Sequence, residues 1–294
     1  MSLQHTLAAP ITFAGVGLHT GREAHVTLKP AAVDAGVVFV RTDLAGPANR
    51  IRAIGEAVCQ TRLGTVIGAG PDVTVSTIEH LMAAFSALGV DNVLVEVDGP
   101  EIPILDGSCA PIVAVLDRAG RRPLGAERQL IEVTQPVEIV EGEKRAALLP
   151  ADQFEVSFEI HFESAAIGRQ EIDLAVDEAS FRDELADARS FGFMHEFDQL
   201  RAAGLARGAS LDNTLVVEGG AILNPGGLRR PGEFVRHKAL DAVGDLYLLG
   251  APLIGRYEGR YAGHSLNNAL VRALLARPEA WRMTTRQSDL ARAV

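Results

Sequence analysis

The feature that most constrains the fold is the order in which two kinds of hydrophobic periodicity follow one another along the chain. Up to about residue 65, apolar and polar side chains alternate, as in residues 24–30 and 36–43, and Gly and Pro separate the segments. This pattern is typical of strands and turns. Apolar residues then recur at three- and four-residue steps over residues 77–88, which predicts a helix. A strand over residues 92–99 and a helix over residues 111–120 complete this half.

The same order begins again after residue 128. Two strands are predicted over residues 130–142, and residues 155–162 alternate as a further strand. Helical spacing returns over residues 197–206, 234–249 and 264–276. Strands followed by helices in each half predict an α+β protein of two domains, residues 1–124 and 125–294.

Composition excludes several classes of protein. The 38 acidic and 28 basic side chains give a formal charge of −10, which argues against nucleic acid as a partner because phosphates need a basic face. The cysteines, Cys59 and Cys109, form no CxxC pair and favour a reduced, cytoplasmic setting. The N-terminus lacks the features of a signal peptide, and apolar stretches end well before the roughly 20 residues that span a bilayer. We expect no stable membrane insertion and a monomer.

The densest group of candidate metal ligands lies within the helix predicted over residues 234–249. His237 and Asp241 are four residues apart, so their side chains project from one face with Cβ atoms about 5–6 Å apart. A metal bonded at about 2 Å to an imidazole and a carboxylate spans that gap. Asp245 adds a carboxylate one turn further along. A solvated helix face with a His–Asp pair is the commoner meaning of this spacing, and a metal site needs a third ligand from elsewhere.

His80 is the candidate third ligand, in the first turn of the helix predicted over residues 77–88. The preceding Glu79 has two interpretations. Ser76 and Glu79 fit a capping box, in which the glutamate is structural. A glutamate beside a zinc-ligating histidine also reaches a catalytic water, as in the HExxH motif, which this chain lacks. His264 is a third histidine, at the start of the last predicted helix, where a capping or a surface histidine is the ordinary interpretation.

These segments together resemble one enzyme family over about residues 10–285. The chain contains, in this order, GVGLHTG, STIEHLMAAFSALGVDN, EIPILDGSCAP, ARSFGF, EFVRHKALDAVGDLYLLG and GHSLNNAL. Such long motifs in one order are similar to those of the UDP-3-O-acyl-N-acetylglucosamine deacetylases. The resemblance implies hydrolysis of the substrate's N-acetyl group, the committed step of lipid A biosynthesis. It also implies two similar two-layer α/β sandwiches (ribosomal protein S5 domain 2-like) with the active site between them.

The resemblance assigns roles to the residues singled out above. His80, His237 and Asp241 would bind one catalytic Zn²⁺, with Fe²⁺ as an alternative for the same ligand set. Glu79 would be the general base and His264 the general acid. The remaining implied catalytic roles are orientation of the acid by Asp245 and hydrogen bonding of the oxyanion by Ser190.

Further residues are implied in binding UDP-3-O-acyl-N-acetylglucosamine. An insert at about residues 190–215 would form an apolar passage for the acyl chain, whose preferred length the sequence leaves open. The implied substrate contacts are Leu18, His19, Phe191, Gly192, Phe193, Ala206, Ala209, Ser210 and Lys238. Two alternatives remain at this point: a zinc amidohydrolase acting on another acylated sugar nucleotide, and a binding protein that has lost catalysis.

Overall fold

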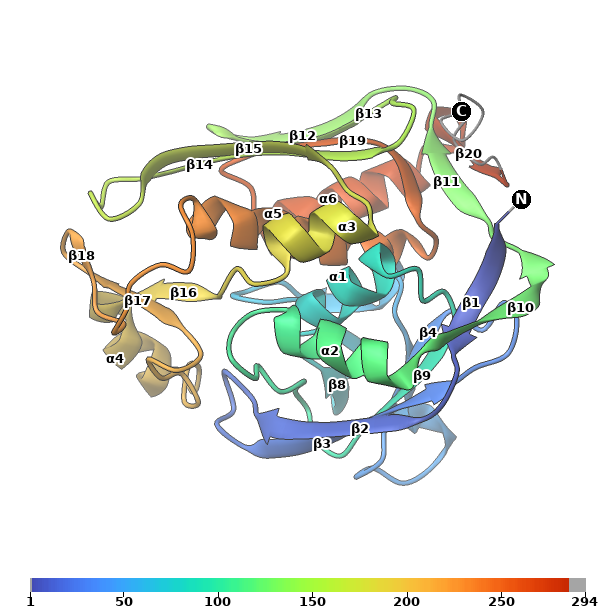
Figure 1. Ribbon diagram of the computed structural model, residues 1–294, viewed down its shortest axis with the longest axis horizontal. Helices are drawn as coiled ribbons and strands as arrows, with labels where there is room; N and C mark the ends of the chain where they lie inside the picture. The colour runs from blue at the N-terminus through green and yellow to red at the C-terminus, as the bar shows by residue number, and fades with distance from the viewer. Residues whose placement is uncertain (1, 286–294) are drawn as a thin grey trace.

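The computed structural model describes residues 2–285 and places β-sheets on two outer faces of the molecule with helices between them (Figure 1). The N-terminal sheet has the strand order β2-β3-β9-β4-β5. In β9, buried Val93, Val95 and Val97 alternate with half-buried residues, as expected where one face of a sheet packs on helices. The strands are β2 (Ile11–Val16), β3 (Glu23–Pro30), β4 (Val37–Arg41), β5 (Arg50–Arg52) and β9 (Val93–Val97).

The C-terminal sheet repeats this topology. Its order is β12-β13-β19-β14-β15, and β11 and β20 extend it. In each sheet the central strand is antiparallel to one neighbour and parallel to the other. β9 is antiparallel to β3 and parallel to β4, and β19 is antiparallel to β13 and parallel to β14. The strands are β11 (Leu130–Val133), β12 (Val137–Glu141), β13 (Lys144–Leu149), β14 (Phe154–Phe162), β15 (Gly168–Ala175), β19 (Leu253–Arg260) and β20 (Trp281–Thr284). The predicted class of two similar α/β sandwiches is confirmed.

The helices fill the space between the sheets because each parallel strand pair needs a crossover. α1 lies between β4 and β9 in the chain, and α5 lies between β14 and β19. The two helices pack directly on each other, and both are buried almost all round. The helices are α1 (Glu79–Ala87), α2 (Ala110–Ala119), α3 (Glu178–Ser180), α5 (Glu233–Leu246) and α6 (His264–Leu275). The helices predicted over residues 77–88, 111–120, 234–249 and 264–276 are confirmed.

Gly244 allows α5 to approach α1 closely. A Cβ atom at Gly244 would lie 2.0 Å from the carbonyl oxygen of Glu79 and 3.1 Å from the backbone nitrogen of Ala83. Any side chain here would therefore push the two helices apart. The close approach matters because both helices carry ionisable side chains into the interface.

A small insert projects from the second half, on the left in Figure 1. It contains β16 (Phe191–Phe193), α4 (Met194–Ala202), β17 (Leu215–Glu218) and β18 (Ala221–Ile222), with the strand order β16-β17-β18. The helix predicted over residues 197–206 was therefore wrong in its bounds. It ends earlier because Gly204 and Ala206 have positive φ angles of 81° and 52°, which no α-helix accommodates.

The remaining strands join the two halves and flank the helices. β1 (Leu3–Leu7) pairs with β10 (Arg121–Glu127), at the predicted boundary between domains. β6 (Val58–Gln60), β7 (Val66–Gly70) and β8 (Val73–Val75) form a separate small sheet. None of the helices in residues 2–285 combines the length and apolar character needed to cross a bilayer. Cys59 is an exposed free thiol and Cys109 a buried one.

Candidate metal centre and active site

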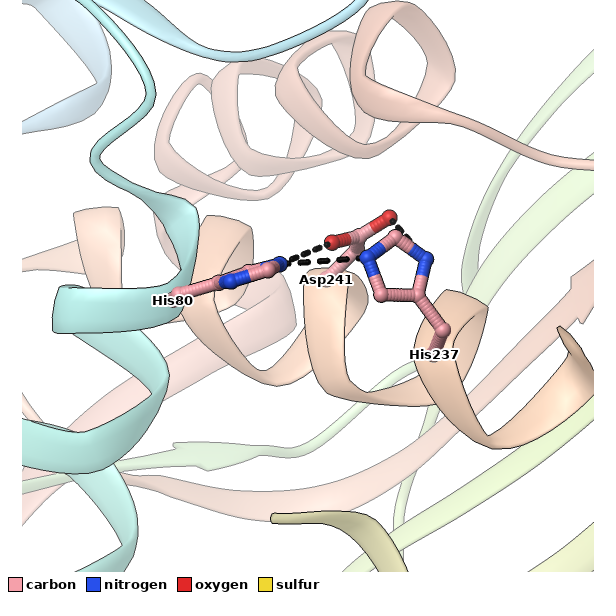
Figure 2. Close-up of side chains that lie close together, drawn as sticks. All are labelled: His80, His237 and Asp241. Carbon is pink, nitrogen blue, oxygen red and sulfur yellow. Dashed lines mark hydrogen bonds and ion pairs between the residues drawn. The ribbon is translucent and has the colours of Figure 1, made fainter. Parts of the chain in front are cut away.

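Three buried side chains from α1 and α5 point toward one another (Figure 2). His80 lies in the first turn of α1, and His237 and Asp241 lie one turn apart on α5. The Nε2 atoms of His80 and His237 are 3.1 Å apart, and His80 Nε2 is 3.5 Å from Asp241 Oδ1. One ligand atom from each residue falls within 4.8 Å of the others. The structure thus brings together the three residues that the sequence nominated as metal ligands.

The geometry and the donor set fit a zinc ion. Two atoms bonded at about 2.05 Å to a tetrahedral zinc lie roughly 3.3 Å apart, close to the separations seen here. Asp241 Oδ1 is buried and has no hydrogen-bond partner among the residues that the structure describes. A buried carboxylate oxygen without a partner is costly unless a cation satisfies it. Burial lowers the pKa of His237 to about 3, so its imidazole stays neutral, as a metal ligand must be.

Lys238 complements the charge of this group. Its Nζ donates a hydrogen bond to Asp241 Oδ2 at 2.7 Å, which leaves Oδ1 directed at His80. Although burial acts to raise it, the pKa of Asp241 is held well below its usual range by the neighbouring His237 and Lys238 side chains. Asp241 therefore remains anionic throughout the physiological range, which suits a metal ligand.

Glu79 is the first residue of α1 and lies beside these three side chains. It is 5% exposed, and burial raises the pKa of its carboxyl group. Its Oε2 atom accepts a hydrogen bond from the backbone N–H of Thr65 at 3.0 Å. The capping-box interpretation is wrong: Ile78 is the N-cap of α1 and makes no side-chain cap, and the Ser76 hydroxyl donates to the carbonyl of Pro100 instead. The Glu79 side chain therefore does not cap α1.

A second ionisable pair, His264 and Asp245, lies near Asp241. His264, the first residue of α6, lies with Nδ1 2.8 Å from Asp245 Oδ2, and its Nε2 is 3.8 Å from Asp241 Oδ2. Asp245 Oδ1 accepts from the Thr65 hydroxyl at 2.6 Å, and Oδ2 also accepts from Asn267 Nδ2 at 2.9 Å. Although burial acts to lower it, the Asp245 carboxylate raises the pKa of His264 to about 9. The imidazole is therefore protonated at neutral pH.

A cavity of about 480 Å³ opens onto these groups. Ser190, immediately before β16, lines it with Oγ 3.1 Å from His237 Nε2. Phe193 does not line the cavity; its ring packs against Phe162 and His195. Ser210 is exposed and its hydroxyl accepts from the N–H of Asp212 in a turn. The other expected substrate contacts all line the cavity: Leu18, His19, Phe191, Gly192, Ala206, Ala209 and Lys238.

The turn that carries Leu18 and His19 is held by buried Glu101. Its carboxylate accepts from the backbone N–H groups of His19 and Thr20, each at 2.8 Å. The ring of His19 is itself engaged, with Nε2 3.1 Å from the Leu63 carbonyl and Nδ1 accepting from Ala206 N–H at 3.4 Å. His19 therefore links the N-terminal half to the insert at the rim of the cavity.

Sequence reasoning did not single out Thr65, Asn267 and Glu101. The signal for Asn267 was present, because it follows His264 by three residues on one helix face. Thr65 and Glu101 carry no such signal, since both act from loops on residues distant in the chain. Only the tertiary structure shows their contacts.

Comparisons with known proteins agree with the resemblance noted in the sequence. The family model for UDP-3-O-acyl N-acetylglycosamine deacetylase (LpxC) matches residues 4–276. The UDP-3-O-acyl-N-acetylglucosamine deacetylase of Phenylobacterium zucineum is 65% identical over 291 residues, which cover 99% of each chain. The Teredinibacter turnerae enzyme of that name is 47% identical over 97% of this chain and 94% of its own. The Myxococcus xanthus enzyme is 46% identical over 95% of this chain and 88% of its own. The chain belongs to the UDP-3-O-acyl-N-acetylglucosamine deacetylase family.

Proposed function

We propose that the chain hydrolyses the N-acetyl group of UDP-3-O-acyl-N-acetylglucosamine and releases acetate and UDP-3-O-acyl-glucosamine, the committed step of lipid A biosynthesis. One observation carries this proposal: the buried metal-ligand group of His80, His237 and Asp241 adjoins both Glu79 and His264 at one cavity. A metal site, a carboxylate and a protonated imidazole are the parts that amide hydrolysis needs. Family membership supports the substrate.

We propose that His80, His237 and Asp241 hold Zn²⁺. Two imidazoles and one carboxylate form the ligand set of catalytic zinc sites, which keep a further position open. When bound, zinc polarises a carbonyl oxygen and lowers the pKa of a coordinated water. Fe²⁺ suits the same ligand set, and metal supply in the cell decides between the two.

Glu79 is proposed as the general base. Thr65 N–H fixes Oε2, so the carboxylate is oriented before the substrate arrives. Its raised pKa makes the carboxylate a stronger proton acceptor than an exposed glutamate. Glu79 takes one proton from the attacking water as the new carbon–oxygen bond forms.

His264 is proposed as the general acid. Its Nδ1–H donates to Asp245, so the Nε2–H faces the cavity and Asp241. Expulsion of an amine anion is prohibitively slow, and the proton on Nε2 converts the leaving nitrogen to a neutral amine as the carbon–nitrogen bond breaks. Asp245 keeps the imidazole protonated and oriented until that step.

The Ser190 hydroxyl is proposed to donate a hydrogen bond to the oxyanion that forms from the acetamide carbonyl, since Ser190 lines the cavity beside His237. Such donors contribute roughly 3–4 kcal/mol in other hydrolases. Lys238 and the segment Phe191–Phe193 are proposed to contact the nucleotide-sugar end, although the ring of Phe193 packs away from the cavity. The acyl chain would pass along the insert, where Ala206 and Ala209 line the cavity.

We further propose that the protein acts as a cytoplasmic monomer whose domains meet near residue 124. The repeated strand topology on either side of β10 supports this division. Residues 286–294 of the second domain lie outside the residues that the structure describes.

The test is deacetylation of UDP-3-O-acyl-N-acetylglucosamine by the purified protein, by the metal-stripped protein, and after zinc is restored. The zinc-restored variant Glu79→Gln keeps the shape of the side chain and removes its basicity. We expect activity that requires metal and is lost in Glu79→Gln. Metal binding without turnover would reject this substrate, and full activity in Glu79→Gln would reject the assignment of the base.

A further inference from the structure

The Thr65 hydroxyl has no part in the chemistry proposed above, yet Thr65 contacts both groups that would move protons. It lies just before β7 and is 1% exposed. Its backbone N–H donates to Glu79 Oε2, and its hydroxyl donates to Asp245 Oδ1 at 2.6 Å. The hydroxyl oxygen is also 3.3 Å from His264 Nδ1. One residue of the N-terminal half thus touches side chains on α1, α5 and α6.

The contacts of Asp245 show what the hydroxyl controls. Its Oδ2 atom is shared by His264 and by Asn267, which is itself held by a 2.6 Å hydrogen bond from the Tyr257 hydroxyl. Among residues 2–285, the hydrogen-bond donor to Oδ1 is Thr65. A carboxylate held at both oxygens has one orientation, whereas a carboxylate held at one oxygen can rotate. The Thr65 hydroxyl therefore fixes the plane in which His264 is held.

We infer that Thr65 is a positioning residue that couples the proposed base to the proposed acid. Its N–H orients Glu79, and its hydroxyl orients Asp245 and, through it, the imidazole of His264. Both contacts are made by one buried residue. Thr65 therefore fixes the position of Glu79 relative to that of His264. This inference rests on the proposed deacetylase function.

The experiment compares Thr65→Val with Thr65→Ser. Valine replaces the hydroxyl by a methyl group of similar volume and keeps the N–H bond to Glu79, whereas serine keeps the hydroxyl. Thr6→Val is the matched control. Thr6 lies in β1 and is 0% exposed, and its hydroxyl also makes two hydrogen bonds. It donates to the Asn92 carbonyl and accepts from the Ala31 N–H. Thr65→Ala serves as a second probe that cannot overfill the site if the valine variant fails to fold.

We expect kcat to fall about 10- to 100-fold in Thr65→Val with KM little changed, as for partners that orient catalytic groups. Thr65→Ser should retain near wild-type kcat, and Thr6→Val should lower the melting temperature without changing kcat. If Thr65 acts through Asp245, the double variant Thr65→Val/Asp245→Asn should be no slower than Asp245→Asn alone. Unchanged kcat in Thr65→Val, equal damage in Thr65→Ser, or additive losses in the double variant would each overturn the inference.

A second readout separates this inference from the proposed function. The NMR signal of the His264 Nδ1 proton, recorded at pH 7 with no substrate, reports the hydrogen bond to Asp245. We expect it to shift in Thr65→Val and to stay in place in Thr65→Ser and Thr6→Val. If the wild type deacetylates no substrate, the proposed function fails, and this signal alone decides: an unmoved signal in Thr65→Val overturns the positioning role.

Discussion

The contact between α1 and α5 at Gly244 predicts that Gly244→Ala separates the proposed metal ligands. The new Cβ atom would lie 2.0 Å from the Glu79 carbonyl oxygen, whereas real Cβ atoms essentially never approach closer than 3.0 Å. The helices must therefore move apart by at least about 1 Å, since helix backbones do not deform locally at small cost. His80 lies on the displaced helix, opposite His237 and Asp241.

The structure sets the scale of the effect. Metal–ligand distances tolerate about 0.2 Å, so a displacement of about 1 Å should weaken metal binding strongly. A misplacement of 1 Å in an active site can cost roughly 100-fold in rate. Overpacking costs about 1–3 kcal/mol, offset in part by the ~1 kcal/mol that alanine gains over glycine in a helix. Loss of the bound metal adds to this change in stability, so zinc content and kcat are the readouts that report the displacement of the helices.

The assay combines zinc content after dialysis, kcat at saturating zinc, and thermal unfolding. Gly125→Ala is the matched control, because Gly125 has no atom within 4 Å of an added Cβ and does not have a positive φ angle. We expect loss of zinc and of kcat in Gly244→Ala only. Wild-type zinc affinity and kcat in Gly244→Ala would refute the reasoning, whatever its melting temperature.

Four further predictions concern the site and the insert. In Asp245→Asn, the pKa of His264 should fall below about 9, because burial lowers it and the Asp245 carboxylate no longer opposes burial. The alkaline limb of kcat should then move to lower pH, and an unmoved limb contradicts the acid assignment. The stability that the pair contributes is fully present below pH 6.5 and lost as pH rises through 9, so the difference in melting temperature between wild type and variant should shrink over that range. Ala209→Phe should shorten the acyl chain accepted, measured as kcat/KM against chain length, whereas exposed Ala202→Phe should leave the preference unchanged. A chelator should lower the melting temperature by about 5 °C or more, since a ligand at 100 times its Kd stabilises by about 2.7 kcal/mol; His237→Ala should be insensitive to the chelator, and equal sensitivity contradicts the ligand assignment.

Much of the fold could be predicted because the apolar residues that pack in the core recur with helical or alternating spacing. Helices α1, α2, α5 and α6 appear as three- and four-residue spacing, and β14 appears as alternation. The insert helix was misplaced for a local reason: the apolar spacing continues past α4, while positive φ angles at Gly204 and Ala206 end the helix. The two strands predicted over residues 130–142 exist as β11 and β12, but they are not neighbours in the sheet.

The candidate site divides in the same way between local and long-range information. The pairing of His237 with Asp241 follows from helical geometry. His80, Glu79 and His264 were candidates from their positions, and the resemblance to the deacetylases supplied their implied roles. The sequence alone left the role of Glu79 open, because a capping box and a catalytic carboxylate share one local pattern. The tertiary structure excludes the capping box, since the Glu79 carboxylate meets Thr65 and not the end of its own helix.

The sequence by itself predicted most helices and strands, their order and the family. Each depends on the spacing of residues or on a motif within a short stretch of the chain. Only the tertiary structure decided that His80 lies 3.1 Å from His237 across 157 residues, and that Thr65 reaches Glu79 and Asp245 at once. Those contacts depend on how closely two buried helices pack. That distance is set by a missing side chain at Gly244, which no local periodicity records.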